Sequence, residues 1–227
     1  MSVRVLVIGD GKMGRAVAQL AVERACAVAG MYGPAEIRAG IAKGIADVAI
    51  EFTEPSAAAG NVRTCLAAGL PVVSGTTGWE DELRVVRAEV ERGGGALLHA
   101  PNFSLGIQLM RRLVEDAATF AAGPAAPALH LVETHHAAKL DAPSGTAKML
   151  ASLARNAFGR ELPVTSVRVG HVPGTHELIV DAPFEQIRIV HEARDRRVFA
   201  EGAIAAAKWL VGKRGVFTFE DFVRDQP

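Results

Sequence analysis

Residues 3–14 read VRVLVIGDGKMG, and this stretch is the strongest indication of the fold of the N-terminal half. Val3–Ile8 is apolar and rich in β-branched residues, which predicts a short buried strand that ends at a glycine. From Met13 to Arg24, apolar residues recur at helical spacing. The stretch therefore predicts a strand, a tight turn and a helix.

The turn itself fits the pattern GxGxxG, formed by Gly9, Gly11 and Gly14. Glycines let the turn fold tightly and let a pyrophosphate approach the backbone, while the first amides of the helix remain free to bind it. Because the pattern follows a strand and opens a helix, it predicts a dinucleotide site rather than a structural turn in an unrelated α/β protein. Asp10, Lys12 and Met13 belong to the same predicted site.

The choice between NADH and NADPH depends on the end of the second predicted strand, where an acidic residue usually binds the adenosine ribose. That end reads Met31–Gly33, and the nearest carboxylate, Glu36, lies beyond Pro34. Three cations could meet a 2′-phosphate or simply lie in solvent: Lys12, Arg15 and Arg38. The sequence leaves the preference open, with a slight lean toward NADPH or toward both cofactors.

Outward from the turn, strands and helices alternate up to residue 100. Strands are predicted at 26–31, 48–52, 71–74 and 96–100, and helices at 56–68 and 80–92. This alternation is typical of βαβ units and a parallel sheet. The predicted class is α/β, with a Rossmann-like parallel-sheet nucleotide-binding domain.

The pattern changes after Pro101. A helix is predicted at 105–122 and a linker at 123–127, followed by segments that read as antiparallel strands at 129–134, 165–168, 177–181, 185–192 and 198–200, with a helix at 147–158. The chain ends with a predicted helix at 202–210 and a short segment at 217–223. These segments predict a central α+β domain with an open mixed sheet.

Composition narrows the possible partners. Lys plus Arg and Asp plus Glu both number 25 in 227 residues, so no net charge favours nucleic acid or an anionic membrane. Cys26 and Cys65 stand in apolar stretches that read as helix interiors, and we expect reduced, buried thiols. No signal peptide and no long apolar run is visible, so the expected location is the cytoplasm.

The most informative stretch is Glu133–Ala147, which reads ETHHAAKLDAPSGTA. His135, His136 and Lys139 precede a predicted helix start at Ser144, where free amides form an anion site. A carboxylate could be held between these amides and the lysine, and histidine exchanges protons near neutral pH. The stretch predicts a site that binds a carboxylate and exchanges a proton with it or near it.

A metal site is the alternative for the adjacent histidines. Successive residues of a strand point to opposite faces, and no Cys or His-x-x-x-His completes a ligand set. We therefore expect no metal.

This stretch is similar to the signature E-x-H-H-x-x-K-x-D-A-P-S-G-T-A of the dihydrodipicolinate reductase family, also called 4-hydroxy-tetrahydrodipicolinate reductase. Further segments resemble the family in the same order: EFTEPSAA from Glu51, SGTTGW from Ser74, HAPNFSLGIQLM from His99, GHVPGTHE from Gly170 and FAEGAIAAAKWLVGKRGVF from Phe199. The glycine turn is one residue shorter than the usual family form, and the region between Gly33 and Val48 is much shorter.

The resemblance implies hydride transfer from NADPH or NADH to a cyclic imine with two carboxylates, in lysine and diaminopimelate biosynthesis. It implies a dinucleotide-binding domain formed by residues 1–102 and 203–227, and a domain at 103–202 that binds substrate and builds a homotetramer. No nucleic-acid or membrane partner is implied.

The resemblance also implies the roles of individual residues. His135 is the expected acid/base and Lys139 the proton donor that also holds a carboxylate; the residues alone leave open which of the two delivers the proton. The other expected substrate ligands are His136, Ser144, Gly145 and Thr146. The nicotinamide side of the cofactor is expected to contact Gly75, Thr76, Thr77, Ala100, Pro101, Asn102 and Phe103.

Two other functions share parts of this pattern. A second two-domain dehydrogenase, acting on aspartate or an amino-acid semialdehyde, has the N-terminal pattern but not the HHxxK cluster before a Ser-Gly-Thr helix start. A non-catalytic dinucleotide sensor would bind cofactor without turnover, because fold alone does not give function.

Overall fold

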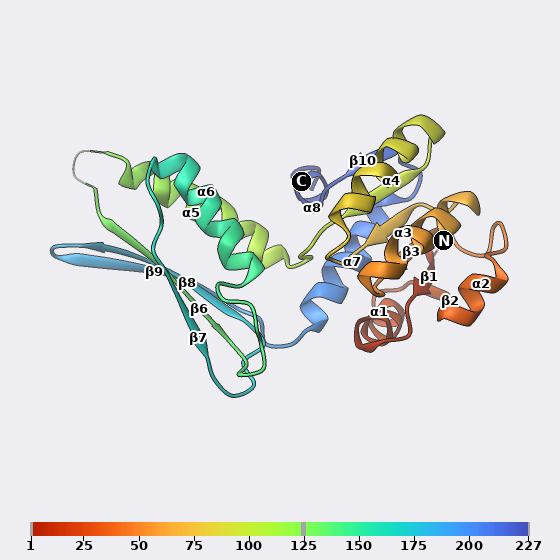
Figure 1. Cartoon of the computed structure of the whole chain (residues 1–227), viewed down its shortest axis with the longest axis horizontal. Coiled ribbons are helices and arrows are strands. Elements are labelled where there is room, and N and C mark those ends of the chain that lie inside the picture. The colour runs from red at the N-terminus through yellow and green to blue at the C-terminus, as the bar shows by residue number, and fades with distance from the viewer. Residues whose placement is uncertain (1, 124–125, 227) are drawn as a thin grey trace. The chain divides into compact units, whose positions relative to one another are not determined.

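The computed structural model describes residues 2–123 and 126–226, and the chain forms two compact units (Figure 1). The first unit comprises Met1–Ser104 and Arg197–Pro227, and the second comprises Leu105–Arg196.

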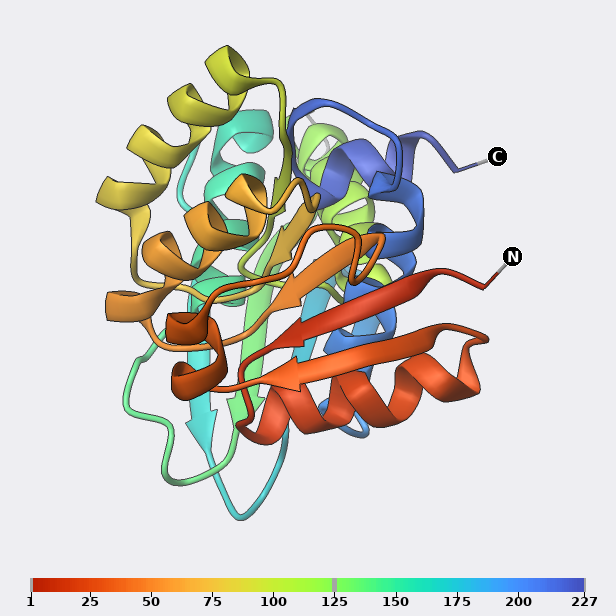
Figure 2. The same ribbon diagram turned by 90° about the vertical axis from the view of Figure 1, so that its right-hand side faces the viewer.

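The first unit contains a six-stranded sheet in the order β10-β5-β4-β3-β1-β2, with every neighbouring pair parallel. Figure 2 shows β1, β2 and β3 running in the same direction. The strands are β1 Arg4–Ile8, β2 Ala27–Tyr32, β3 Val48–Glu51, β4 Val72–Ser74, β5 Ala96–His99 and β10 Gly215–Phe217. The helices are α1 Lys12–Glu23, α2 Pro34–Ala39, α3 Pro55–Ala67, α4 Glu80–Gly93, α7 Arg197–Leu210 and α8 Phe219–Arg224. The predicted Rossmann-like parallel sheet is confirmed.

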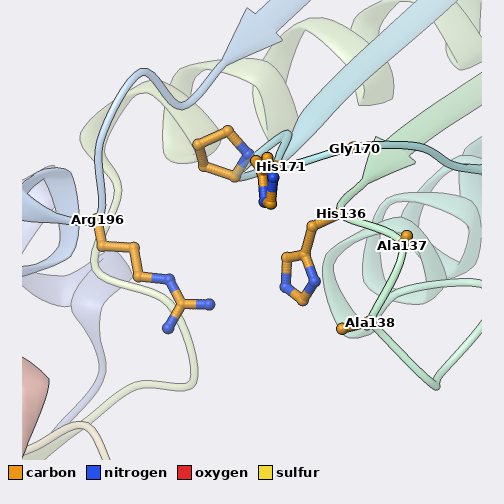
Figure 3. A pocket seen from close by; sticks show the side chains of 7 residues that line it. His136, Ala137, Ala138, Gly170, His171 and Arg196 are labelled. Carbon is orange, nitrogen blue, oxygen red and sulfur yellow. The ribbon is translucent and has the colours of Figure 1, made fainter.

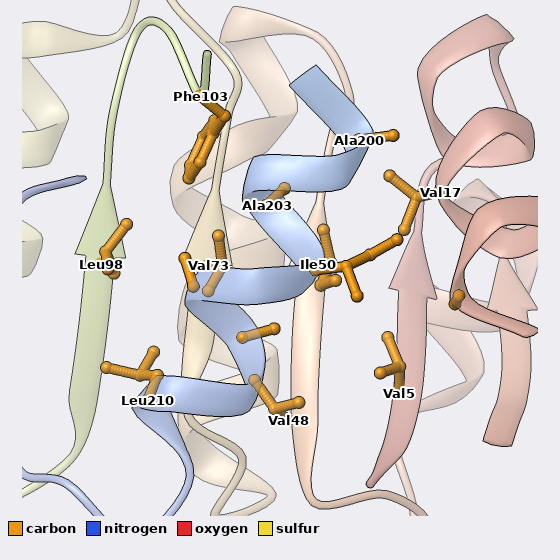
Figure 4. Packing of buried hydrophobic residues seen from close by; sticks show 14 of the residues in the cluster. Val5, Val17, Val48, Ile50, Val73, Leu98, Phe103, Ala200, Ala203 and Leu210 are labelled. Carbon is orange, nitrogen blue, oxygen red and sulfur yellow. The ribbon is translucent and has the colours of Figure 1, made fainter. Parts of the chain in front are cut away.

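Both faces of this sheet are buried, which explains why its strands are apolar at nearly every position. On one face, Val5, Ile50 and Val73 pack with residues of α1 and α7, such as Val17 and Ala203 (Figure 4). On the other face, neighbouring strand residues pack with α3 and α4: Leu6, Ile8, Ala49, Val72 and Leu97. The carboxyl ends of the strands are therefore held in place by a hydrophobic core on each face of the sheet.

The predicted strand at 198–200 is wrong, because these residues lie inside α7. Val198 and Phe199 are good strand formers in isolation, but the buried positions continue at helical spacing through Ala203 and Ala207. At Gly202 a Cβ would lie 1.8 Å from the carbonyl oxygen of Phe103, so the helix approaches that backbone closely. Packing in the first unit thus overrides the local preference.

The second unit has a four-stranded sheet in the order β7-β6-β8-β9, with one face covered by two helices. The strands are β6 Ala128–His135, β7 Val164–Arg168, β8 Thr175–Ala182 and β9 Glu185–Glu192, and the helices are α5 Leu105–Ala121 and α6 Gly145–Phe158. Leu131, Leu150 and Leu178 form part of the core between them. The open mixed sheet is as predicted.

The predicted antiparallel direction of the strand at 165–168 is wrong. β7 pairs parallel with β6, whereas β8 is antiparallel to both β6 and β9. The reason is the connection: α6 carries the chain from the end of β6 back to the beginning of β7, and such a helical crossover joins parallel strands.

Smaller differences concern short segments. α2 has no counterpart among the predicted helices, and the segment at 217–223 divides between β10 and α8. Cys26 follows α1 instead of lying in a helix, whereas Cys65 lies in α3; both thiols are free and buried. The predicted linker at 123–127 includes residues 124–125, which lie outside the described residues. Within the described part of the chain, no helix is both long and apolar enough to span a membrane.

Candidate active site and cofactor site

Close backbone contacts leave no room for a side chain at two positions of the glycine turn. Gly9 has a φ of +109°, and a Cβ there would lie 2.1 Å from the carbonyl oxygen of Phe52. A Cβ on Gly14 would lie 1.9 Å from the carbonyl oxygen of Gly9. At Gly11, by contrast, no described heavy atom lies within 4 Å of the Cβ position. The turn thus needs two of its glycines for packing and leaves space above the third.

This open space meets the start of α1, which begins at Lys12 and has no side chain at Gly11 to cap it. Uncapped amides at a helix N-terminus bind anions such as a pyrophosphate. A cavity of about 410 Å³ adjoins the turn, at the carboxyl ends of β1, β2 and β3. Its lining residues are Gly9, Asp10, Gly11, Tyr32, Gly33, Pro34, Ile37, Phe52, Thr53, Glu54, Ala57 and Asn61. The residues present fit a dinucleotide.

Of the other predicted cofactor residues, Lys12 is exposed at the start of α1, and Met13 packs partly against the core. Two groups follow the next strands of the sheet: Gly75, Thr76 and Thr77 after β4, and Ala100, Pro101, Asn102 and Phe103 after β5. Carboxyl ends of parallel strands share one edge, so these loops continue the edge that carries the cavity. The Phe103 side chain lies in the core, with its ring centroid 6.0 Å from that of Phe52.

Glu51, which was not among the site residues predicted from the sequence, links the loop after β3 to the loop after β4. Its carboxylate is fully buried and accepts hydrogen bonds from Ser74 Oγ and Thr76 Oγ1, both at 2.6 Å. It also accepts from the backbone N–H of Thr53 at 2.9 Å. This carboxylate therefore fixes the ends of β3 and β4 relative to each other.

In the second unit, the signature stretch is organised around Glu133, whose carboxylate is fully buried on β6. It accepts hydrogen bonds from Arg168 Nη2 at 2.7 Å and from Arg168 Nη1 at 3.0 Å. It also accepts from the backbone N–H of Ser144 at 3.2 Å and from His135 Nδ1. Burial alone would raise the pKa of Glu133, but hydrogen bonds from Arg168, Ser166, His135 and Ser144 hold it at about 2.

These contacts fix the His135 ring. Because a carboxylate can only accept, Nδ1 carries the proton that is donated to Glu133, and Nε2 is left as the acceptor. The ring is 8% exposed, and burial lowers its pKa although the Glu133 carboxylate opposes that shift. His176 packs edge-on against it, with ring centroids 5.3 Å apart. The contact with Glu133 thus orients the His135 ring, and burial favours its neutral form.

His136 has a different environment. With Ala137, Ala138, Gly170, His171, Pro173 and Arg196 it lines a cavity of about 390 Å³. Figure 3 shows the side chains of His136 and Arg196 pointing toward each other across this space, with His171 beside them. All of these residues belong to the second unit, and the cationic or cationisable ones suit an anionic ligand.

The remaining predicted site residues are Lys139 and the residues at the start of α6. Lys139 Nζ contacts Asp141 Oδ1 at 2.7 Å, and its side chain is only 23% exposed. Ser144 caps α6 by accepting from the backbone N–H of Ala147 at 3.2 Å, and its hydroxyl also contacts His176 Nε2 at 3.2 Å. Gly145 and Thr146 are the first residues of α6. The first turn of this helix therefore begins beside Glu133 and His176.

The partners of the signature residues were not predicted from the sequence. Glu133 could have been identified, because residues two apart on a strand share a face and Glu133 precedes His135 by that spacing. Arg168, His171 and His176 come from β7, β8 and their connection, and no local pattern links them to the signature. Among the described residues, no group of three or more His, Cys, Asp and Glu side chains is arranged to hold a metal ion.

Comparison with known proteins covers both units. The family model "Dihydrodipicolinate reductase, N-terminus" matches residues 3–103, and "Dihydrodipicolinate reductase, C-terminus" matches residues 106–223. A 4-hydroxy-tetrahydrodipicolinate reductase from Christiangramia forsetii is 39% identical over 191 residues, covering 79% of this chain and 80% of the relative. One from Thiobacillus denitrificans is 33% identical over 266 residues, covering 97% of this chain and 98% of the relative.

Solved structures agree on the fold. A dipicolinate-bound dihydrodipicolinate reductase from Paenisporosarcina sp. TG-14 superimposes with a TM-score of 0.77 at 21% identity, covering 96% of this chain and 98% of that one. Aspartate dehydrogenase from Thermotoga maritima gives 0.51 at 13% identity, covering 94% and 98%. From the family models and the relatives that match it, this chain belongs to the dihydrodipicolinate reductase family.

Proposed function

We propose that this chain is a 4-hydroxy-tetrahydrodipicolinate reductase, an NAD(P)H-dependent oxidoreductase of lysine and diaminopimelate biosynthesis. The single observation that carries this proposal is the arrangement of ETHHAAKLDAPSGTA around one buried carboxylate, in a chain that matches the family over both units. The reaction reduces the dihydrodipicolinate ring to tetrahydrodipicolinate.

In this proposal the first unit holds the dinucleotide, which supplies the hydride. Gly9–Met13 would bind the pyrophosphate, and the loops at 75–77 and 100–103 would contact the nicotinamide side. The second unit holds the substrate. This division is supported by the open space above Gly11 and the cavity beside it in the first unit.

The substrate carries two carboxylates, which need compensating charge in a site of the second unit. Lys139, His136 and the amides of Ser144, Gly145 and Thr146 would bind one or both of them. Arg196 adds a guanidinium and His171 an imidazole to the cavity that His136 lines. The Paenisporosarcina relative, solved with dipicolinate bound, holds a ring dicarboxylate of the same class.

Reduction by hydride also requires a proton at the neighbouring ring atom. His135 presents a free Nε2 lone pair in a fixed orientation, so it can relay a proton only after taking one up. Lys139, whose Nζ contacts Asp141 Oδ1 at 2.7 Å, has an ammonium group that can donate a proton. The residues thus offer two donors, and variants of each distinguish them.

We further propose that the enzyme works in the cytoplasm as a homotetramer assembled through the second unit. A sedimentation mass equal to the monomer would contradict the tetramer.

The test is oxidation of NADPH and, separately, of NADH by the purified protein, with substrate generated in place from pyruvate and aspartate semialdehyde. Turnover that depends on the condensed product supports the proposal. His135→Ala and Lys139→Ala should lose most of kcat with cofactor affinity unchanged, whereas His130→Ala, on the same strand, should retain it. Cofactor binding without turnover would favour the sensor, and turnover of aspartate would favour the other dehydrogenase.

A further inference from the structure

A carboxylate, that of Glu36, lies at the end of β2, although its position in the sequence suggests that it is too far along the chain to contact the adenosine ribose. Glu36 lies beyond Pro34 in the chain, but α2 turns back, and Glu36 Oε2 accepts a hydrogen bond from the backbone N–H of Gly33 at 2.9 Å. The acidic group is therefore at the strand end after all, where adenosine ribose hydroxyls bind in Rossmann-like folds.

A second carboxylate comes from the glycine turn. A Cβ on Gly33 would lie 3.2 Å from Asp10 Oδ2 and 3.3 Å from Glu36 Oε2, so the two carboxylates flank this glycine. Gly33 and Asp10 both line the 410 Å³ cavity, as does Glu54. The adenosine end of the proposed cofactor site thus has Asp10 and Glu54 in its lining, and Glu36, which is not a lining residue, hydrogen-bonded to the lining residue Gly33.

The cationic side chains that could balance the charge of a 2′-phosphate do not line this cavity. Lys12, Arg15 and Arg38 are exposed, and none of them is among the residues that line the cavity. Arg15 Nε donates to the backbone carbonyl of Asp10 at 2.7 Å, so it is directed to the turn and not to the Asp10 carboxylate. The described lining residues include neither lysine nor arginine.

We propose that Asp10 and Glu36 make this enzyme prefer NADH to NADPH, an inference that rests on the proposed function. A ribose 2′-hydroxyl can donate a hydrogen bond to a carboxylate. A 2′-phosphate carries a charge of roughly −1.5 to −2 at neutral pH, so the same carboxylates repel it. The apolar lining from Ile37, Ala57 and Phe52 suits the adenine, which both cofactors share.

The experiment measures the dissociation constants of NADH and NADPH for the full chain by nicotinamide fluorescence, without substrate, so the readout is independent of turnover. We expect NADPH to bind at least about tenfold more weakly, equivalent to about 1.4 kcal/mol. The double variant Asp10→Asn/Glu36→Gln keeps acceptor oxygens and removes both charges, and should reduce this ratio about tenfold or more. Glu91→Gln, on α4 and away from the cavity lining, is the matched control and should leave the ratio unchanged.

A second measurement needs no variant. Because repulsion is screened by salt, the NADPH to NADH ratio of dissociation constants should fall as ionic strength rises from about 0.01 to 1 M. Equal or tighter binding of NADPH, a ratio that is insensitive to salt, or an unchanged ratio in a folded double variant would each overturn the inference and leave the proposed function intact. Failure to bind either dinucleotide would instead contradict the proposed function.

Discussion

Arg168 contacts both carboxylate oxygens of Glu133, at 2.7 and 3.0 Å, and the carboxylate has no exposed surface. The pair joins β6 to β7, and Arg168 Nη2 also donates to the backbone carbonyl of Asp141 at 2.6 Å, which fixes the loop before α6. The same carboxylate accepts hydrogen bonds from His135 Nδ1 and from the backbone N–H of Ser144. Glu133 therefore orients the His135 ring and positions the start of α6.

Glu133→Gln should therefore lower kcat about 10- to 100-fold, because the amide lacks the charge that orients His135 and opposes the fall in its pKa. Cofactor affinity should not change. The pH profile of kcat/KM separates this role from a structural one, since any limb due to His135 should move to lower pH. Glu177→Gln, which removes a partly exposed partner of Arg188, is the control. A profile that does not move would show that Glu133 does not act through the histidine.

His176 should make stability depend on pH. Burial, together with the neighbouring His135 and His191, lowers its pKa from 6.5 to about 4, and burial is the largest of these causes. Between these values the unfolded chain binds a proton that the native protein does not, so stability falls as pH decreases from 6.5 toward 4, by up to about 3 kcal/mol. His176→Gln should reduce this slope in urea unfolding measured at pH 7, 5.5 and 4.5.

His171→Gln is the matched control for that prediction, because His171 is exposed and its loss should leave the pH slope as it is. If His176→Gln kept the full dependence of stability on pH, that dependence would come from other buried histidines. Burial also lowers the pKa values of His99 and His135.

Much of the first unit could be predicted from the sequence, because its strands are continuous apolar runs and its helices have regular spacing. Residues 198–200 show the limit: a short run of good strand formers is helical because α7 packs its small residues on the sheet. The direction of β7 was also mispredicted, since pairing is set by the α6 crossover and not by the residues of the strand.

Part of the candidate site could likewise be predicted from the sequence, and part could not. The signature and the glycine turn are contiguous, so the sequence identifies them. Glu36 was judged by its distance along the chain, and only the turn of α2 returns it to Gly33. Arg168 contacts Glu133 because β7 pairs with β6, and Arg196 lines the same cavity as His136 because of the path of the chain after β9. Neither contact can be predicted from a local sequence pattern.

Arg196→Gln should raise the KM for the dicarboxylate about tenfold while kcat and cofactor affinity change little, because this guanidinium faces His136 across an anion-compatible cavity. Arg194→Gln changes an exposed arginine outside that cavity lining and should have little effect. Initial rates at varied substrate provide both constants. A large fall in kcat with KM unchanged would assign Arg196 to the chemical step and not to binding.

The glycine turn permits a test that separates folding from cofactor binding. Gly14→Ala should destabilise the protein strongly, because the new Cβ would lie 1.9 Å from the carbonyl oxygen of Gly9, and backbone cannot move aside as a flexible side chain can. Gly11→Ala should fold normally, since no described heavy atom approaches its Cβ position within 4 Å, but should weaken both NADH and NADPH by filling the space that a pyrophosphate would occupy.

Gly60→Ala, in α3, gives the reference for a helical glycine with open space around it, and should stabilise the protein by about 0.5–1 kcal/mol. Thermal unfolding and nicotinamide fluorescence on the three variants should therefore give three different outcomes. If Gly11→Ala kept full affinity for both dinucleotides, the pyrophosphate would not pass over this turn, and the cavity beside Gly33 would lose its assignment to adenosine.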